Sequence, residues 1–121
     1  MNSDSTYAFY GSLRRGMSNY LHFQSGLEFL YVETITGYQL YAMEKYPYAI
    51  KTDVPSDSIV VEVFKASNPE TEKAIHELEL SVGYDYSEVT IRDKPVGIYL
   101  FKASRGETLV KGGDWVEFFR P

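Results

Sequence analysis

The chain has 121 residues, of which 44% are hydrophobic and 16% aromatic, and its formal net charge is -5. This length suits a single domain over residues 1–121 with an ordinary apolar core. The negative charge argues against general binding to nucleic acid or anionic lipid, and the absence of cysteine excludes disulfides, zinc–thiolate sites and thiol nucleophiles.

The first half of the chain is dominated by predicted strands. Residues 6–10 form a short apolar run that Gly11 ends, and a polar loop follows over residues 14–25, with room for one helical turn near Tyr20. Apolar and polar residues then alternate in further segments, which we expect to be strands because side chains on a strand point alternately to its two faces. These strands are predicted at 27–36, 38–43 and 59–65, and residues 46–50 are predicted to form a turn that leads to a short strand.

A helix is predicted to begin after Asn68. Asparagine is a favoured N-cap residue, Pro69 suits the first helical position, and an acidic residue at Glu70 complements the helix dipole. Gly83 lies just beyond the expected end. The residues expected to form the apolar face of this helix are Thr71, Ala74, Ile75 and Leu78.

A hairpin is predicted after the helix, with strands over 86–91 and 96–103, and a last short stretch at 108–115 completes the chain. Strands on both sides of one helix predict an α+β domain, in which a curved antiparallel or mixed sheet carries one principal helix.

The loop after the first strand is the first candidate site. Glycine at Gly11 tolerates unusual backbone angles and close approach, and successive N–H groups in such a turn bind anions. Ser12 adds a hydroxyl donor, while Arg14 and Arg15 add positive charge near the entrance. The same residues equally describe a tight turn with two solvated arginines, so both interpretations stay open at this point.

Residues 9–16, Phe-Tyr-Gly-Ser-Leu-Arg-Arg-Gly, resemble the Tyr-Gly-Ser-Leu signature of the γ-glutamylcyclotransferase-like superfamily. Three more segments resemble that family in the same order along the chain, and the ending is similar to that of its small bacterial, AIG2-like members. They are residues 37–41 with the following Tyr46-Pro47 turn, residues 60–64, and residues 113–115. The resemblance therefore covers nearly the whole chain.

The resemblance implies a small curved mixed β-barrel with one principal helix and short flanking helical turns. It also implies a cofactor-free reaction in which the α-amine of a γ-glutamyl compound attacks its own γ-carbonyl, giving 5-oxoproline and a released amine. The substrate would bind at the loop, with Tyr10, Gly11, Ser12 and Leu13 as binding residues. Tyr86 would either donate its hydroxyl to the pocket or pack as a half-buried tyrosine of the sheet.

A glutamate at the end of the helix transfers the proton in this family, and the matching residue is Glu79. The surrounding pattern departs from the family: His76 replaces an aspartate, Leu80 a glycine, and Glu88 an arginine. Asp85 is therefore a second candidate for the acid or base, and loss of catalysis is a third possibility. His76 is expected at the surface.

Three hypotheses follow for function. The first is an enzyme that cyclises a γ-glutamyl amine or peptide, the second a binding domain of the same fold for an amino-acid-like ligand, and the third an interaction protein. We expect no metal site, because the chain has only two histidines and no cysteine. No apolar run approaches the roughly 20 residues of a membrane span and no secretory signal is recognisable, so a cytoplasmic location is expected. The oligomeric state stays undetermined.

Overall fold

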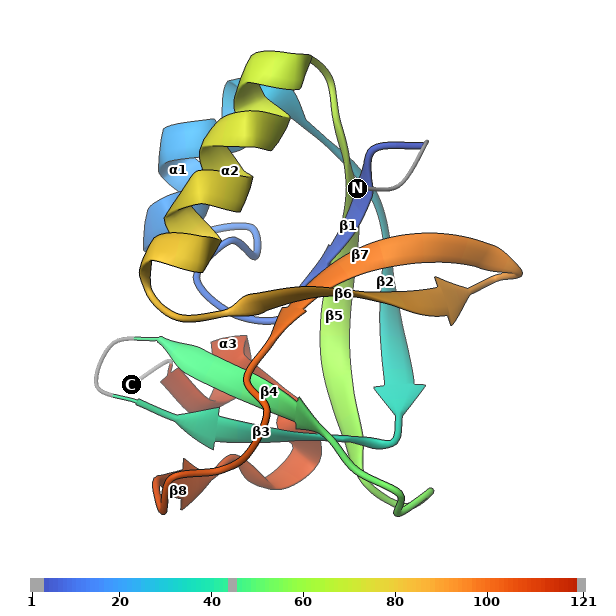
Figure 1. The fold of residues 1–121 in the computed structure, drawn as a ribbon, viewed down its shortest axis with the longest axis vertical. Helices are drawn as coiled ribbons and strands as arrows, with labels where there is room; N and C mark the ends of the chain where they lie inside the picture. Colours follow the sequence, from blue (N-terminus) through green and yellow to red (C-terminus); the bar gives the residue numbers. More distant parts are fainter. Residues whose placement is uncertain (1–3, 44–45, 120–121) are drawn as a thin grey trace.

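The structure is a computed structural model that describes residues 4–43 and 46–119 (Figure 1). Its fold is α+β, as expected. The helices and strands in chain order are β1 (Thr6–Phe9), α1 (Ser18–Phe23), β2 (Leu27–Thr36), β3 (Tyr38–Ala42), β4 (Pro47–Lys51), β5 (Ser58–Ala66), α2 (Pro69–Ser81), β6 (Asp85–Ile91), β7 (Lys94–Leu100), β8 (Thr108–Leu109) and α3 (Trp115–Phe119).

The larger sheet has five strands in the order β2-β5-β1-β7-β6. Strand β1 lies at its centre, antiparallel to β5 and parallel to β7, so the sheet is mixed. The parallel contact is made where Tyr7 faces Gly97, and a Cβ atom at Gly97 would lie 2.8 Å from the rings of Tyr7 and Tyr86. A glycine is therefore required at this position for the central strands to pack.

The smaller sheet has three strands in the order β4-β3-β8. The expectation of a barrel needs correction here, because the strands of the described residues form two sheets that do not close on each other. The physical reason lies at Gly37, whose φ of +84° turns the chain sharply between β2 and β3. Strand β3 therefore leaves the edge of the large sheet and starts the small one.

Buried side chains lie on both faces of the large sheet. On β1, Tyr7 and Phe9 belong to the cluster on one face, together with Ile75 of α2, whereas Ala8 belongs to the cluster on the other. This alternation is what a strand buried on both sides requires. Figure 1 shows α2 lying along one side of the sheet, which is the side that the Tyr7 cluster occupies.

Helix α2 begins as predicted: the side-chain oxygen of Asn68 accepts a hydrogen bond of 2.8 Å from the N–H of Thr71. Its buried face differs from the prediction. Ile75 is buried, but Ala74 is exposed, and partly buried Glu72 and Glu79 take places beside the apolar residues. The helix is therefore rotated so that polar side chains also face the sheet.

Two short helices differ from the sequence prediction. Helix α1 has six residues where a single turn was expected, and α3 was not predicted at all. In α3, the N–H of Glu117 donates to Oδ1 of Asp114 at 3.2 Å, and Trp115 is buried against the core. No helix in the described ranges is long and apolar enough to cross a membrane.

A candidate ligand pocket after the first strand

A pocket lies where the end of β1 meets the last turn of α2 and the start of β4. It has a cavity volume of about 60 Å³, which is small compared with typical ligand pockets. A larger ligand would therefore place one end inside and extend from the mouth. The lining residues are Ala8, Phe9, Tyr10, Gly11, Ser12, Leu13, Asn19, Tyr46, Pro47, Leu78, Glu79, Val82, Tyr84 and Tyr99.

The loop from Tyr10 to Leu13 is held in place by helix α1. The carbonyl oxygen of Ser12 accepts hydrogen bonds from the N–H groups of Asn19 and Tyr20, both at 3.0 Å. The hydroxyl of Ser12 also accepts a bond of 2.8 Å from the side-chain amide of Asn19. Within the described residues, the N–H groups of Gly11, Ser12 and Leu13 make no hydrogen bond. They are therefore donors available to an oxygen atom of a ligand.

Gly11 is required here for close packing, because its φ is not in the left-handed region. A Cβ atom at this position would lie 2.7 Å from Cγ and Cδ of Pro47. The first reason expected for this glycine, unusual backbone angles, is thus wrong, and the second, close approach, is confirmed. The atom that approaches belongs to the protein's own proline.

Glu79 lies in the last turn of α2 and lines the same pocket as the loop. Burial raises the pKa of this carboxyl from 4.5 to about 7, because the charged form is poorly solvated there. No hydrogen bond or ion pair reaches its carboxylate from any other residue in the described part of the chain. A carboxylate of this kind can take up a proton near neutral pH.

Three tyrosines surround Glu79. Burial raises the pKa of Tyr10, Tyr84 and Tyr99, and the nearby negative charge of Glu79 raises each of them further. The hydroxyl of Tyr10 donates to the carbonyl of Tyr99 at 2.5 Å and accepts from the N–H of Ala49 at 3.2 Å. The hydroxyl of Tyr84 donates to the carbonyl of Pro47. These bonds fix the pocket wall.

Two residues named from the sequence lie outside the lining. Tyr86, expected to bind substrate, packs against Tyr7 and Tyr99, and its hydroxyl donates to Glu88 at 2.9 Å. The chain reaches the pocket at Tyr84, before β6 begins, so Tyr84 lines the pocket and Tyr86 does not. Asp85, the alternative acid or base, is an exposed residue at the first position of β6.

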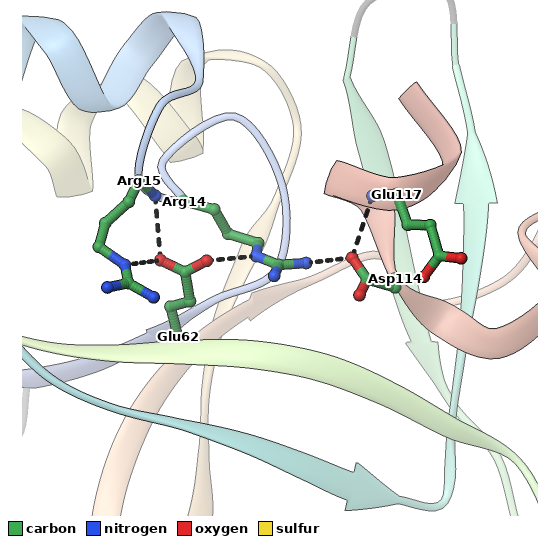
Figure 2. A network of polar contacts seen from close by, with 5 residues as sticks. All are labelled: Arg14, Arg15, Glu62, Asp114 and Glu117. Atoms are coloured by element: carbon green, nitrogen blue, oxygen red, sulfur yellow. Dashed lines mark hydrogen bonds and ion pairs between the residues drawn. The ribbon is translucent and has the colours of Figure 1, made fainter. Parts of the chain in front are cut away.

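Neither of the two arginines after the loop lines the pocket. Both pair with carboxylates instead (Figure 2). Arg14 is buried, and its Nε donates to Oε2 of Glu62 at 2.8 Å while Nη1 donates to Oδ1 of Asp114 at 2.7 Å. Arg15 donates to Oε1 of Glu62 from both its backbone N–H, at 3.0 Å, and its Nε, at 2.9 Å. Arg14 is therefore buried, whereas Arg15 is paired but remains exposed, and neither residue lines the pocket entrance that the sequence had suggested for them.

Glu62 is the acceptor that holds this network together. Burial alone would raise its pKa, but hydrogen bonds from Arg15 and Arg14 outweigh that effect and lower the pKa below the usual value. The pKa of Asp114 is lowered in the same way, against burial, by its bonds from Arg14 and the backbone of α3. Both carboxylates are therefore ionised, and the positive charge of the arginines is neutralised.

Several lining residues were not predicted from the sequence, chiefly Tyr84, Tyr99 and Asn19. Tyr84 directly follows Gly83, where φ is +102° and the chain turns back from α2 toward the sheet. A tyrosine directly after the glycine that ends the helix was the sequence signal that could have indicated this lining residue. Tyr99 gave no comparable signal, because its neighbours on β7 form a continuous apolar run.

The geometry defines a class: a small α+β domain with a backbone-donor loop after its first strand and one carboxylate of raised pKa facing that loop. The sequence matches the family model described as "Gamma-glutamyl cyclotransferase, AIG2-like" over residues 7–117. The chain belongs to this family.

Relatives agree with that assignment. The chain is 34% identical over 111 residues to "Putative gamma-glutamylcyclotransferase PH0828" of Pyrococcus horikoshii, covering 91% of this chain and 90% of that one. The crystal structure of PH0828 superposes with a TM-score of 0.79 at 32% identity, covering 94% and 92% of the two chains. The solution structure of protein ytfP from Escherichia coli has a TM-score of 0.69 at 26% identity, covering 95% and 99%.

Proposed function

We propose that this protein is an enzyme that cyclises a γ-glutamyl amine or γ-glutamyl peptide to 5-oxoproline and releases the amine, with Glu79 as the acid and base. One observation carries the proposal. The carboxylate of Glu79, with its pKa raised to about 7, lines the same pocket as the loop N–H groups of Gly11, Ser12 and Leu13.

The loop suits the α-carboxylate of a γ-glutamyl group. Three consecutive backbone N–H groups without partners in the described residues offer donors to a carboxylate oxygen, and a concave set of N–H groups favours an anion. Because Arg14 and Arg15 are paired elsewhere, recognition would rest on these backbone donors. The small cavity would hold the glutamyl end, and the leaving amine would extend from the mouth.

The proposed reaction forms one bond and breaks one bond. The α-amine nitrogen attacks the γ-carbonyl carbon, and the new carbon–nitrogen bond closes a five-membered ring. Glu79 takes a proton from the attacking nitrogen and delivers it to the leaving nitrogen as the original amide bond breaks. A pKa near neutrality allows both transfers, since the carboxylate must be ionised to accept the proton and acidic enough to return it. A folded substrate held in the pocket lowers the entropic cost of ring closure.

The test is to incubate the purified protein with a γ-glutamyl amine, a γ-glutamyl dipeptide and a γ-glutamyl-lysine isopeptide, and to measure 5-oxoproline by mass spectrometry. We expect 5-oxoproline and free amine in equal amounts from at least one of these compounds. In Glu79→Gln the rate should fall by about 100-fold or more, as loss of a general acid–base group does.

Glu77→Gln is the matched control, because it removes the same charge from an exposed position on the same helix. Its rate should equal that of the unaltered protein. A folded protein that forms no 5-oxoproline from any compound would overturn the proposal. Binding of the same compounds without turnover would then support the alternative, a non-catalytic domain for an amino-acid-like ligand.

A further inference from the structure

One face of α2 presents a row of titratable side chains to the sheet. Glu72, His76 and Glu79 follow one another at spacings of four and three residues, which places them along one side of the helix. The hydroxyl of Tyr7 on β1 donates to Glu72, and His76 contacts Tyr99 on β7. Glu79 continues the row into the pocket, where no such bond reaches its carboxylate from the rest of the described chain.

His76 is not the solvated surface residue that the sequence suggested. It is partly buried, and its Nδ1 lies 2.9 Å from the hydroxyl oxygen of Tyr99. Its ring also packs edge-on against Tyr86, with the ring centres 6.0 Å apart. The histidine therefore occupies a defined place between α2 and the two strands β6 and β7.

Tyr99 connects His76 to the pocket. It lines the pocket together with Glu79, and the charge of Glu79 contributes to raising its pKa, so the two groups lie close to each other. The backbone of Tyr99 is also fixed, because its carbonyl accepts the hydroxyl of Tyr10 at 2.5 Å. The position of this phenol beside Glu79 is therefore determined by the fold.

A phenol has one proton to donate. If Tyr99 gives that proton to Nδ1 of His76, it has none left for the carboxylate of Glu79. This matters because a hydrogen bond to a carboxylate stabilises its charged form and makes it a weaker base. The partner of the Tyr99 hydroxyl thus decides how basic the pocket carboxylate is.

We propose that His76 is a positioning residue of this site: it accepts the hydroxyl proton of Tyr99 and thereby keeps that proton from Glu79. The inference rests on the proposed function, in which Glu79 is the base. It requires neutral His76 with an unprotonated Nδ1. The titratable groups that face His76 are Tyr99 and Tyr86 from the sheet, with Glu72 and Glu79 on its own helix.

The experiment follows the titration of Glu79 by carbon-13 NMR of the glutamate carboxyl groups, with Glu79→Gln identifying the resonance. In His76→Leu the freed hydroxyl of Tyr99 should turn to Glu79 and lower its pKa by roughly one unit. In His76→Asn a side-chain oxygen replaces Nδ1 as acceptor, and the pKa should stay at the value of the unaltered protein. His76→Ala, which also lacks an acceptor, serves if the leucine variant does not fold.

The same substitutions are then made in Tyr99→Phe, because phenylalanine has no hydroxyl proton that could turn from His76 to Glu79. There, adding His76→Leu should leave the pKa of Glu79 unchanged. An unchanged or raised pKa in both His76→Leu and His76→Ala would overturn the proposal, as would an equal fall in the Tyr99→Phe background.

This measurement needs no turnover, so the two proposals can fail separately. If no 5-oxoproline forms but the pKa of Glu79 responds as described, the proposed function fails and the action of His76 on Glu79 stands. If 5-oxoproline forms but the pKa does not respond, the inference about His76 alone fails. When both hold, the pH at which kcat/KM reaches half its maximum should fall in His76→Leu by the same roughly one unit.

Discussion

Arg14 donates from Nε to Oε2 of Glu62 at a distance of 2.8 Å, and both side chains are buried. This pair, with the bond from Arg14 to Asp114, directs the cation next to the pocket loop toward β5 and the start of α3, away from the pocket lining. The loop is thereby tied to β5 at its far end, while helix α1 holds it through Ser12.

Glu62→Gln should destabilise the protein by about 3 kcal/mol, because removing one partner leaves a buried guanidinium partly uncompensated. Urea unfolding followed by circular dichroism measures this difference. Arg15→Ala is the control: the side chain of Arg15 is 46% exposed, and pairs of that kind contribute about 1 kcal/mol or less. Equal losses in the two variants would contradict the role assigned to the buried pair.

Gly11→Ala should move Pro47 or the loop, because the new methyl carbon would lie 2.7 Å from two atoms of the proline ring. Overpacking of this kind costs about 1–3 kcal/mol, and the change falls at the pocket itself. We expect weaker binding of 5-oxoproline by calorimetry as well as a lower unfolding midpoint.

Gly16→Ala is the comparison within the same loop, since no atom lies within 4 Å of its added carbon. Its φ of +82° makes alanine strained, so a loss of about 1 kcal/mol is expected there too, but without a change in binding. A change in binding of the same size in both variants would mean that contact with Pro47 is not the cause.

Glu79→Gln should stabilise the protein at pH 8. The folded-state pKa of about 7 lies above the usual 4.5, so the folded protein binds the proton more tightly and loses stability as pH rises from 4.5 to 7. Above pH 7 the penalty is complete, on the order of 3 kcal/mol, and below pH 4.5 it vanishes. Thermal unfolding of both proteins at pH 4 and pH 8 tests this, with exposed Glu77→Gln expected to show less than about 0.5 kcal/mol at either pH.

Tyr10→Phe should cost about 1–3 kcal/mol, because the carbonyl of Tyr99 and the N–H of Ala49 both lose their buried partner. Tyr41→Phe is the matched control: its hydroxyl donates to the side chain of Gln39 in a partly exposed position, where water can replace it. Urea unfolding should separate the two variants clearly, and similar losses would count against the bridging role of Tyr10.

Local signals predicted most of the elements. The alternation over residues 27–36 gave the bounds of β2, and Asn68 with Pro69 gave the start of α2. Helix α3 was missed because its start depends on Asp114, whose position is set by Arg14 from the far end of the chain. Contacts between residues so far apart in the chain leave no periodic pattern in the sequence.

In the pocket, too, the residues in local motifs were predictable, whereas the arrangement that depends on long-range contacts was not. Its loop and Glu79 were named from family motifs, and the structure places them around one cavity. The rotation of α2 was not predictable, since spacing alone favoured Ala74 over His76 for the buried face. The partners of this polar side are long-range ones, among them Tyr7 on β1 and Tyr99 on β7.

The central position of β1 has a consequence for how the chain folds. Its parallel neighbour β7 lies far from it along the sequence. Pairing of such distant segments slows folding, because a long stretch of chain must be ordered before the contact forms. The pocket loop that follows β1 therefore acquires its wall, to which Tyr99 of β7 contributes, only after this long-range pairing has formed.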